Sequence, residues 1–144
     1  MSLERGFTCV SRLVMLTGLL VLMMGNAPMP KVKTSGTFTN LRWHEEAGDI
    51  LGIEVRIVMG WKTYQATVQL GEGEPSDLVL AKQVLVKGTS IEITFMDPFP
   101  NRASRTTMKI QGQIRSDRLV GRIIYSPSGN SETINLPRTK SYWE

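Results

Sequence analysis

The chain has 144 residues and carries 17 Lys and Arg against 13 Asp and Glu, a formal net charge of +4 at pH 7. This excess of positive charge is too small to indicate a nucleic-acid-binding protein. The only cysteine, Cys9, precedes an apolar run, so the chain after that run has no thiol for a disulfide, a thiolate nucleophile or a metal site.

The N-terminus has the pattern of an export segment. Arg5 and Arg12 precede an uncharged apolar run at residues 13–24, and small residues follow at 25–27. We therefore predict a signal peptide over residues 1–27 and an exported protein, either periplasmic or secreted. The apolar run is shorter than the roughly twenty residues of a spanning helix, but the uncharged stretch continues to Pro30. An inner-membrane anchor over residues 13–30 is the alternative.

The remaining chain is long enough for one domain. Residues 28–35 are rich in proline, lysine, threonine and serine without periodicity and are predicted to form a flexible linker. Residues 36–144 are predicted to form a single β-domain.

Side-chain alternation predicts eight short strands in this domain. Apolar and polar residues alternate most regularly at residues 61–70, and no stretch repeats with the 3.6-residue period of a helix. Residues 71–77 are predicted to form an acidic loop and residues 97–105 the longest loop. The predicted strands cover residues 37–45, 50–59, 61–70, 78–86, 91–96, 108–115, 118–125 and 131–136.

The sixth and seventh predicted strands form a hairpin around Ser116 and Asp117. Pairing outward from this turn places Gly112 opposite Gly121 and gathers the apolar residues on one face. A glycine pair on a buried face either coils the sheet sharply or lets a ligand or another backbone come close. The predicted apolar face consists of Met108, Ile110, Gly112, Ile114, Leu119, Gly121, Ile123 and Tyr125.

Eight short strands joined by tight turns predict an all-β, antiparallel up-and-down meander. Closing such a meander into a small barrel removes exposed strand edges and encloses an interior wide enough for side chains or one small ligand. A two-sheet β-sandwich is the alternative.

The stretch Gly36-Thr37-Phe38-Thr39-Asn40 opens the first predicted strand. It resembles the Gly-x-Trp start of calycin barrels, the lipocalins and avidins, with Phe38 at the tryptophan position. The resemblance implies the barrel topology more than a ligand. The whole pattern is similar to that of uncharacterised small exported bacterial β-barrel proteins, a family that implies no function. It consists of an export segment, a short meander and a chain end that reads Lys140-Ser141-Tyr142-Trp143.

The search for catalytic and cofactor motifs is mostly negative. The lone histidine, His44, stands beside Glu45 and Glu46, but strand alternation sends His44 and Glu45 to opposite faces, so we expect a solvated turn. The acidic loop lacks the ligand ladder of a calcium site. The chain also has no nucleophile elbow and no phosphate-binding loop. We predict no cofactor, no metal and no catalytic residues.

Two regions are candidates for contact with a ligand or partner. The loop at 97–105 holds Phe99 between two prolines; it either meets a partner or tucks Phe99 onto the barrel rim. The polar face of the hairpin carries cations that either stay solvated or meet an anionic membrane or cell-wall surface near Arg138 and Lys140. The candidate contact residues are Phe99, Arg102, Arg105, Gly112, Gly121 and Tyr125, and the basic face consists of Lys109, Arg115, Arg118 and Arg122.

These observations favour a non-enzymatic, exported binding or interaction module for an unknown small apolar ligand or an envelope partner. The alternative is a structural or envelope-associated protein that uses its basic face, and an enzyme ranks third. At the C-terminus, Trp143 is expected to pack beside Trp43 or Trp61 or to join a contact surface.

Overall fold

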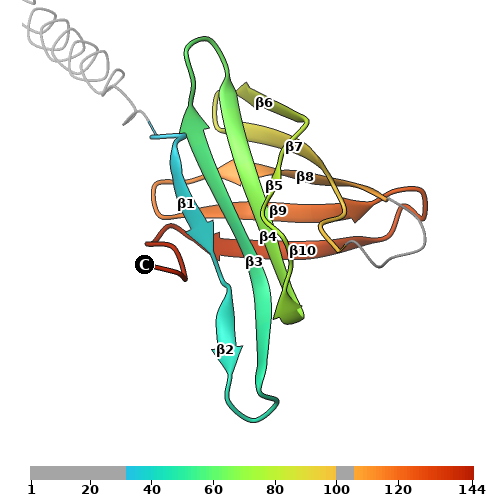
Figure 1. Ribbon diagram of the computed structural model, residues 1–144. Coiled ribbons are helices and arrows are strands. Elements are labelled where there is room, and N and C mark those ends of the chain that lie inside the picture. Colours follow the sequence, from blue (N-terminus) through green and yellow to red (C-terminus); the bar gives the residue numbers. More distant parts are fainter. Residues whose placement is uncertain (1–31, 100–105) are drawn as a thin grey trace, which may run out of the picture. The chain divides into compact units, whose positions relative to one another are not determined.

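Two antiparallel sheets make up the part of the chain that the computed structural model describes, residues 32–99 and 106–144 (Figure 1). No helix occurs among these residues, so the all-β prediction is confirmed for them. The first sheet contains β1 (Gly36–Thr39), β2 (Arg42–His44), β3 (Asp49–Met59), β4 (Tyr64–Pro75) and β5 (Val79–Leu80). The second contains β6 (Gln83–Lys87), β7 (Ser90–Met96), β8 (Thr107–Ile114), β9 (Arg118–Tyr125) and β10 (Ser131–Pro137).

β1 and β2, the two parts of the first predicted strand, both pair with β3, and the later strands of each sheet pair in chain order, as expected of a meander. The ladders do not close into one ring among the described residues. A closed barrel is therefore not detected, and the arrangement is compatible with the two-sheet alternative. The division falls inside the predicted fourth strand, because β5 pairs with β4 whereas β6 pairs with β7. Between them, the Ala81 N–H donates to the Ala66 carbonyl and the Lys82 N–H to the Thr94 carbonyl, both at 2.8 Å.

The two sheets also meet through β1 and the end of β10. Phe38 and Arg138 form an isolated antiparallel bridge, and the Thr139 N–H donates to the Thr37 carbonyl at 3.1 Å. The strands of one sheet cross those of the other in Figure 1, and the core lies between them. Its fully buried large side chains come from both sheets and are Phe38, Val55, Ile57, Val68, Ile93, Phe95, Met108, Ile110, Ile114, Leu119 and Leu136.

The register predicted for the β8–β9 hairpin is confirmed. Ile110 pairs with Ile123, Gly112 with Gly121, and the Arg115 N–H donates to the Arg118 carbonyl across the turn at 2.8 Å. The predicted apolar face points inward, because its large aliphatic side chains are buried whereas Arg115 and Arg122 on the other face are exposed.

Three predicted boundaries are wrong. The third strand begins at Tyr64 and not at residue 61, because residues 61–63 belong to the turn after β3. The first strand is interrupted at Asn40, whose side-chain Oδ1 accepts a hydrogen bond from the Ile53 N–H at 2.8 Å in place of a regular ladder contact. The predicted acidic loop begins as strand, because β4 runs to Pro75 and pairs Gly71 with Gly52 of β3. Glycine and charge indicated a loop there, but the long β3 offers a pairing partner along its whole length.

The predicted export segment, residues 1–27, lies outside the described residues. Within residues 32–99 and 106–144, no helix has the length and apolar character needed to cross a membrane.

Candidate functional site

A recess opens between the two sheets where the beginning of β3 and the end of β4 face β9 and β10. Its volume is about 540 Å³. Gly52, Gly71 and Gly73 line it without side chains, and Gly52 and Gly73 have positive φ values of 118° and 99°. The apolar part of its lining consists of Leu51, Ile53, Leu70, Ile123 and Ile134, and the polar part of Asn40, Asp49, Glu72, Tyr125, Glu132 and Thr133.

The polar lining of the recess is acidic. It contains three carboxylates, and no lysine, arginine or histidine is among the lining residues. The Tyr125 hydroxyl donates to Glu132 Oε2 at 3.3 Å, which ties β9 to β10 at this position. Among the described residues, no group of three or more His, Cys, Asp or Glu side chains is arranged to hold a metal ion.

The structure separates the predicted contact residues from one another. Tyr125 lines the inter-sheet recess, whereas Gly112 lines a second depression beside the β6–β7 turn. Phe99 packs against the hydrophobic core, as in the rim-covering alternative, and its N–H donates to Asp97 Oδ1 at 3.0 Å. Arg102 and Arg105 lie outside the described residues.

The Gly112/Gly121 pair brings two backbones together. A Cβ placed on Gly121 would lie 2.2 Å from the Gln111 carbonyl oxygen, and one on Gly112 would lie 2.4 Å from the Val120 carbonyl oxygen. Of the predicted roles, this geometry matches the close approach of another backbone, because the space beside each glycine is filled by the neighbouring strand.

The predicted basic face is partly neutralised. Lys109 Nζ lies 2.9 Å from Glu92 Oε1, and Arg118 Nη2 lies 2.7 Å from Asp117 Oδ2. The hydrogen bond from Lys109, followed by one from Gln111, lowers the pKa of the Glu92 carboxyl below its usual value. Both acids therefore remain charged at neutral pH and offset two of the four predicted cations.

No family model, curated protein or solved structure matches the chain. The lipocalin-like resemblance of residues 36–40 therefore stays a prediction, and the functional argument depends on the geometry of this structure.

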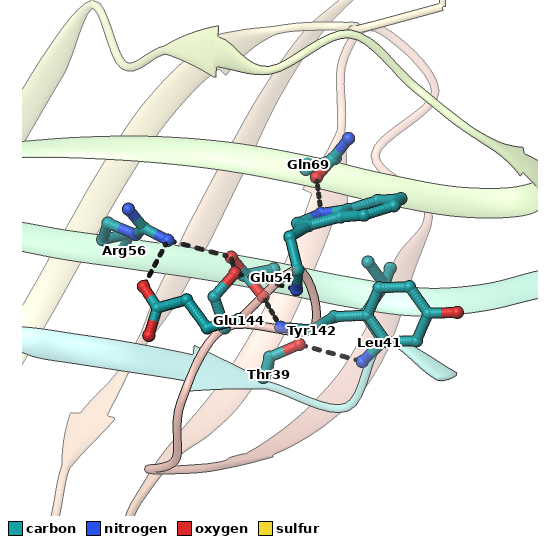
Figure 2. Close-up of polar contacts among 9 residues, drawn as sticks. Thr39, Leu41, Glu54, Arg56, Gln69, Tyr142 and Glu144 are labelled. Atoms are coloured by element: carbon teal, nitrogen blue, oxygen red, sulfur yellow. Dashed lines mark hydrogen bonds and ion pairs between the residues drawn. The ribbon is translucent and has the colours of Figure 1, made fainter. Parts of the chain in front are cut away.

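Glu54 forms a site that sequence reasoning missed. Its position in β3 is on the outer face, yet it is only 3% exposed, because the C-terminal segment covers it (Figure 2). The Ser141 hydroxyl donates to Glu54 Oε1 at 2.7 Å and the Tyr142 N–H donates to Oε2 at 2.9 Å. The carboxylate thus holds the tail through both of its oxygens.

The last two residues extend this contact along the outer face of the first sheet. Trp143 Nε1 donates to Gln69 Oε1 at 2.7 Å, and Glu144 Oε1 lies 3.7 Å from Arg56 Nη2 (Figure 2). Trp143 therefore binds a polar residue of β4 and stays 53% exposed. We call residues 141–144, with Glu54 and Gln69, the C-terminal latch.

Replacing Glu54 with alanine is expected to lower the free energy of unfolding by about 2 kcal/mol, because one buried and one partly buried hydrogen bond to a charged acceptor are lost. The tail amides at 142–144 should then exchange with deuterium faster. Urea unfolding and hydrogen exchange measure the two effects. Glu45→Ala, at an exposed turn, is the control and should change stability by less than about 0.5 kcal/mol. Equal stabilities for the two variants would contradict the latch.

Arg138 is the second residue whose role sequence reasoning missed. It was expected near a basic surface, but its guanidinium donates to the carbonyls of Ser116, Ser35 and Lys33 and lies 4.5 Å from the centroid of the Phe38 ring. Partial burial lowers the pKa of this group. The side chain joins the segment before β1, the β8–β9 turn and the end of β10, so we call it the Arg138 clamp.

Proposed function

We propose that the protein is a non-enzymatic binding module, acting after export, that holds a small ligand in the inter-sheet recess. The observation that carries this proposal is the recess itself, whose volume of about 540 Å³ is in the range of small-molecule sites. Its lining combines five aliphatic side chains, which would contact an apolar ligand body, with six polar ones, three of them carboxylates, which would accept hydrogen bonds from a polar end of the ligand.

The position of His44 supports a role without catalysis. His44 stands in β2 opposite Asp49, and it is not among the residues that line the recess. Its Nδ1 is buried and makes no hydrogen bond within the described residues. A general base must lie within hydrogen-bond reach of the group on which it acts, and His44 does not line the recess in which we place the ligand.

The basic face is a weaker basis for a function. Lys109 and Arg118 each have an acidic partner, and Arg138 is engaged with backbone carbonyls. Attraction to an anionic surface grows with the number of cations that have no such partner.

Binding is tested with the neutral apolar dye N-phenyl-1-naphthylamine, whose fluorescence rises in apolar surroundings. Glu132→Trp places a large ring at the recess, because Glu132 pairs with the inward-facing Ile123, and it should weaken dye binding about tenfold, a loss of about 1.4 kcal/mol. Asn135→Trp is the matched control, because Asn135 is also exposed on β10 but does not line the recess. Absence of dye binding by the wild-type protein, or equal affinity in both variants, would reject the proposal.

A further inference from the structure

The turn between β3 and β4 exposes apolar side chains on both faces of its hairpin. Trp61 is 94% exposed, Met59 56% and Val58 47%. Val58 and Met59 are consecutive strand residues and therefore point to opposite faces. Lys62 follows Trp61 and is also exposed. We call residues 58–62 the hairpin tip.

The hairpin tip lies at the end of the first sheet where the described chain begins. Gly36, the first residue of β1, pairs with Ile57, next to Val58 (Figure 1). Lys33 and Arg56 line a shallow depression together with Val58. Lys33 and Arg56 in this depression, together with Lys62 of the tip itself, place three cations at this end, and Arg56 lies 3.7 Å from Glu144 and 3.8 Å from Glu54.

The apolar run near the N-terminus is close in sequence to the end of the domain that carries the hairpin tip. Only seven residues, 25–31, separate the apolar run at 13–24 from Val32, and the chain then enters β1 beside the tip. A run that stays in a bilayer would, through so short a connection, hold this end of the domain within reach of the membrane surface.

We propose that the hairpin tip inserts into the interface of a lipid bilayer that contains anionic headgroups. Tryptophan favours the headgroup level, where its ring is apolar and its indole N–H stays in polar surroundings. Apolar side chains on both faces of a hairpin suit an environment that surrounds the tip, as a lipid bilayer does. Lysine and arginine next to inserted apolar residues attract anionic lipids.

Quenching of tryptophan fluorescence by brominated lipids tests this insertion in the full chain. The protein has three tryptophans, and Trp43 stands at the opposite end of the first sheet, opposite Ile50 in register. Vesicles of brominated phosphatidylglycerol should quench the wild type and Trp43→Phe to a similar extent. Trp61→Phe should lose most of this quenching even if the N-terminal run keeps the chain on the vesicle. Trp43 stands at the opposite end of the sheet, and Trp143 is bound to Gln69, whose partner Glu54 is in the middle of β3.

Equal quenching in Trp61→Phe and Trp43→Phe would overturn the proposal. Quenching that is as strong with brominated phosphatidylcholine at low salt would overturn the assignment to anionic lipid. The competing occupant of the tip is a second copy of the chain, and sedimentation without lipid tests it. A dimer that Trp61→Phe abolishes would assign the tip to that second copy and overturn the proposal. Dye binding in the recess is measured separately, so either proposal can fail while the other holds.

Discussion

Replacing Gly121 with alanine is expected to lower the free energy of unfolding by about 3 kcal/mol, at the upper end of the usual cost of overpacking. The new Cβ would lie 2.2 Å from the Gln111 carbonyl oxygen and 2.6 Å from the Gly112 Cα. Both atoms belong to the backbone of β8, so no side-chain rotation relieves the contact. The strands must move apart, and the β8–β9 ladder that carries the buried Ile110/Ile123 pair is weakened.

Urea unfolding followed by circular dichroism measures this loss. Gly88→Asn is the matched control, because a Cβ at Gly88 meets no atom within 4 Å and asparagine tolerates its positive φ of 62°. The control should lose less than about 1 kcal/mol. If Gly121→Ala were as stable as the control, the two strands would not be in the close contact described here.

Loss of the Arg138 clamp is expected to lower the free energy of unfolding by about as much as Gly121→Ala does. Arg138→Ala removes hydrogen bonds to the Ser116, Ser35 and Lys33 carbonyls and the contact with the Phe38 ring. Hydrogen bonds that involve a charged group contribute about 1.5–3 kcal/mol each when desolvated and less where water competes, so we expect a total near 3 kcal/mol. Arg138→Lys should lie between the wild type and the alanine variant, because lysine keeps the charge but not the planar fork.

Chemical unfolding gives the stability of these variants, and hydrogen exchange locates the effect. Amides at 36–39 should exchange faster in Arg138→Ala, because β1 loses the side chain that holds the segment before it. Arg122→Ala is the control, since Arg122 is exposed and makes one 3.5 Å contact with Gln111. A stability loss of less than about 0.5 kcal/mol is typical of such a position. An equally small loss of stability in Arg138→Ala would contradict the role given to the Arg138 clamp.

The candidate recess was only partly predictable. Tyr125 was among the predicted contact residues and does line the recess, because its place on the apolar face followed from alternation. Gly52, Gly71 and Gly73 were not predicted to line a pocket. The pattern of glycines and acids at 71–77 is the same in a solvated loop and in a strand that pairs with a long neighbour.

The hairpin of β8 and β9 is the element that the sequence by itself determined. Its turn, its register and its buried face all follow from residues within eight positions of Ser116 and Asp117, because alternation and turn geometry are local properties of the chain. The same local rules gave the all-β class and the chain-order pairing of the strands.

Tertiary structure alone decided which outward-facing residues are buried and where the meander divides. Glu54 and Arg56 occupy equivalent outward positions in β3, yet only Glu54 is covered, by a tail 87 residues later in the chain. Arg138 reaches the Ser35 carbonyl across 103 residues. No local pattern records such contacts, because they form only when distant segments are brought together by the burial of a shared core.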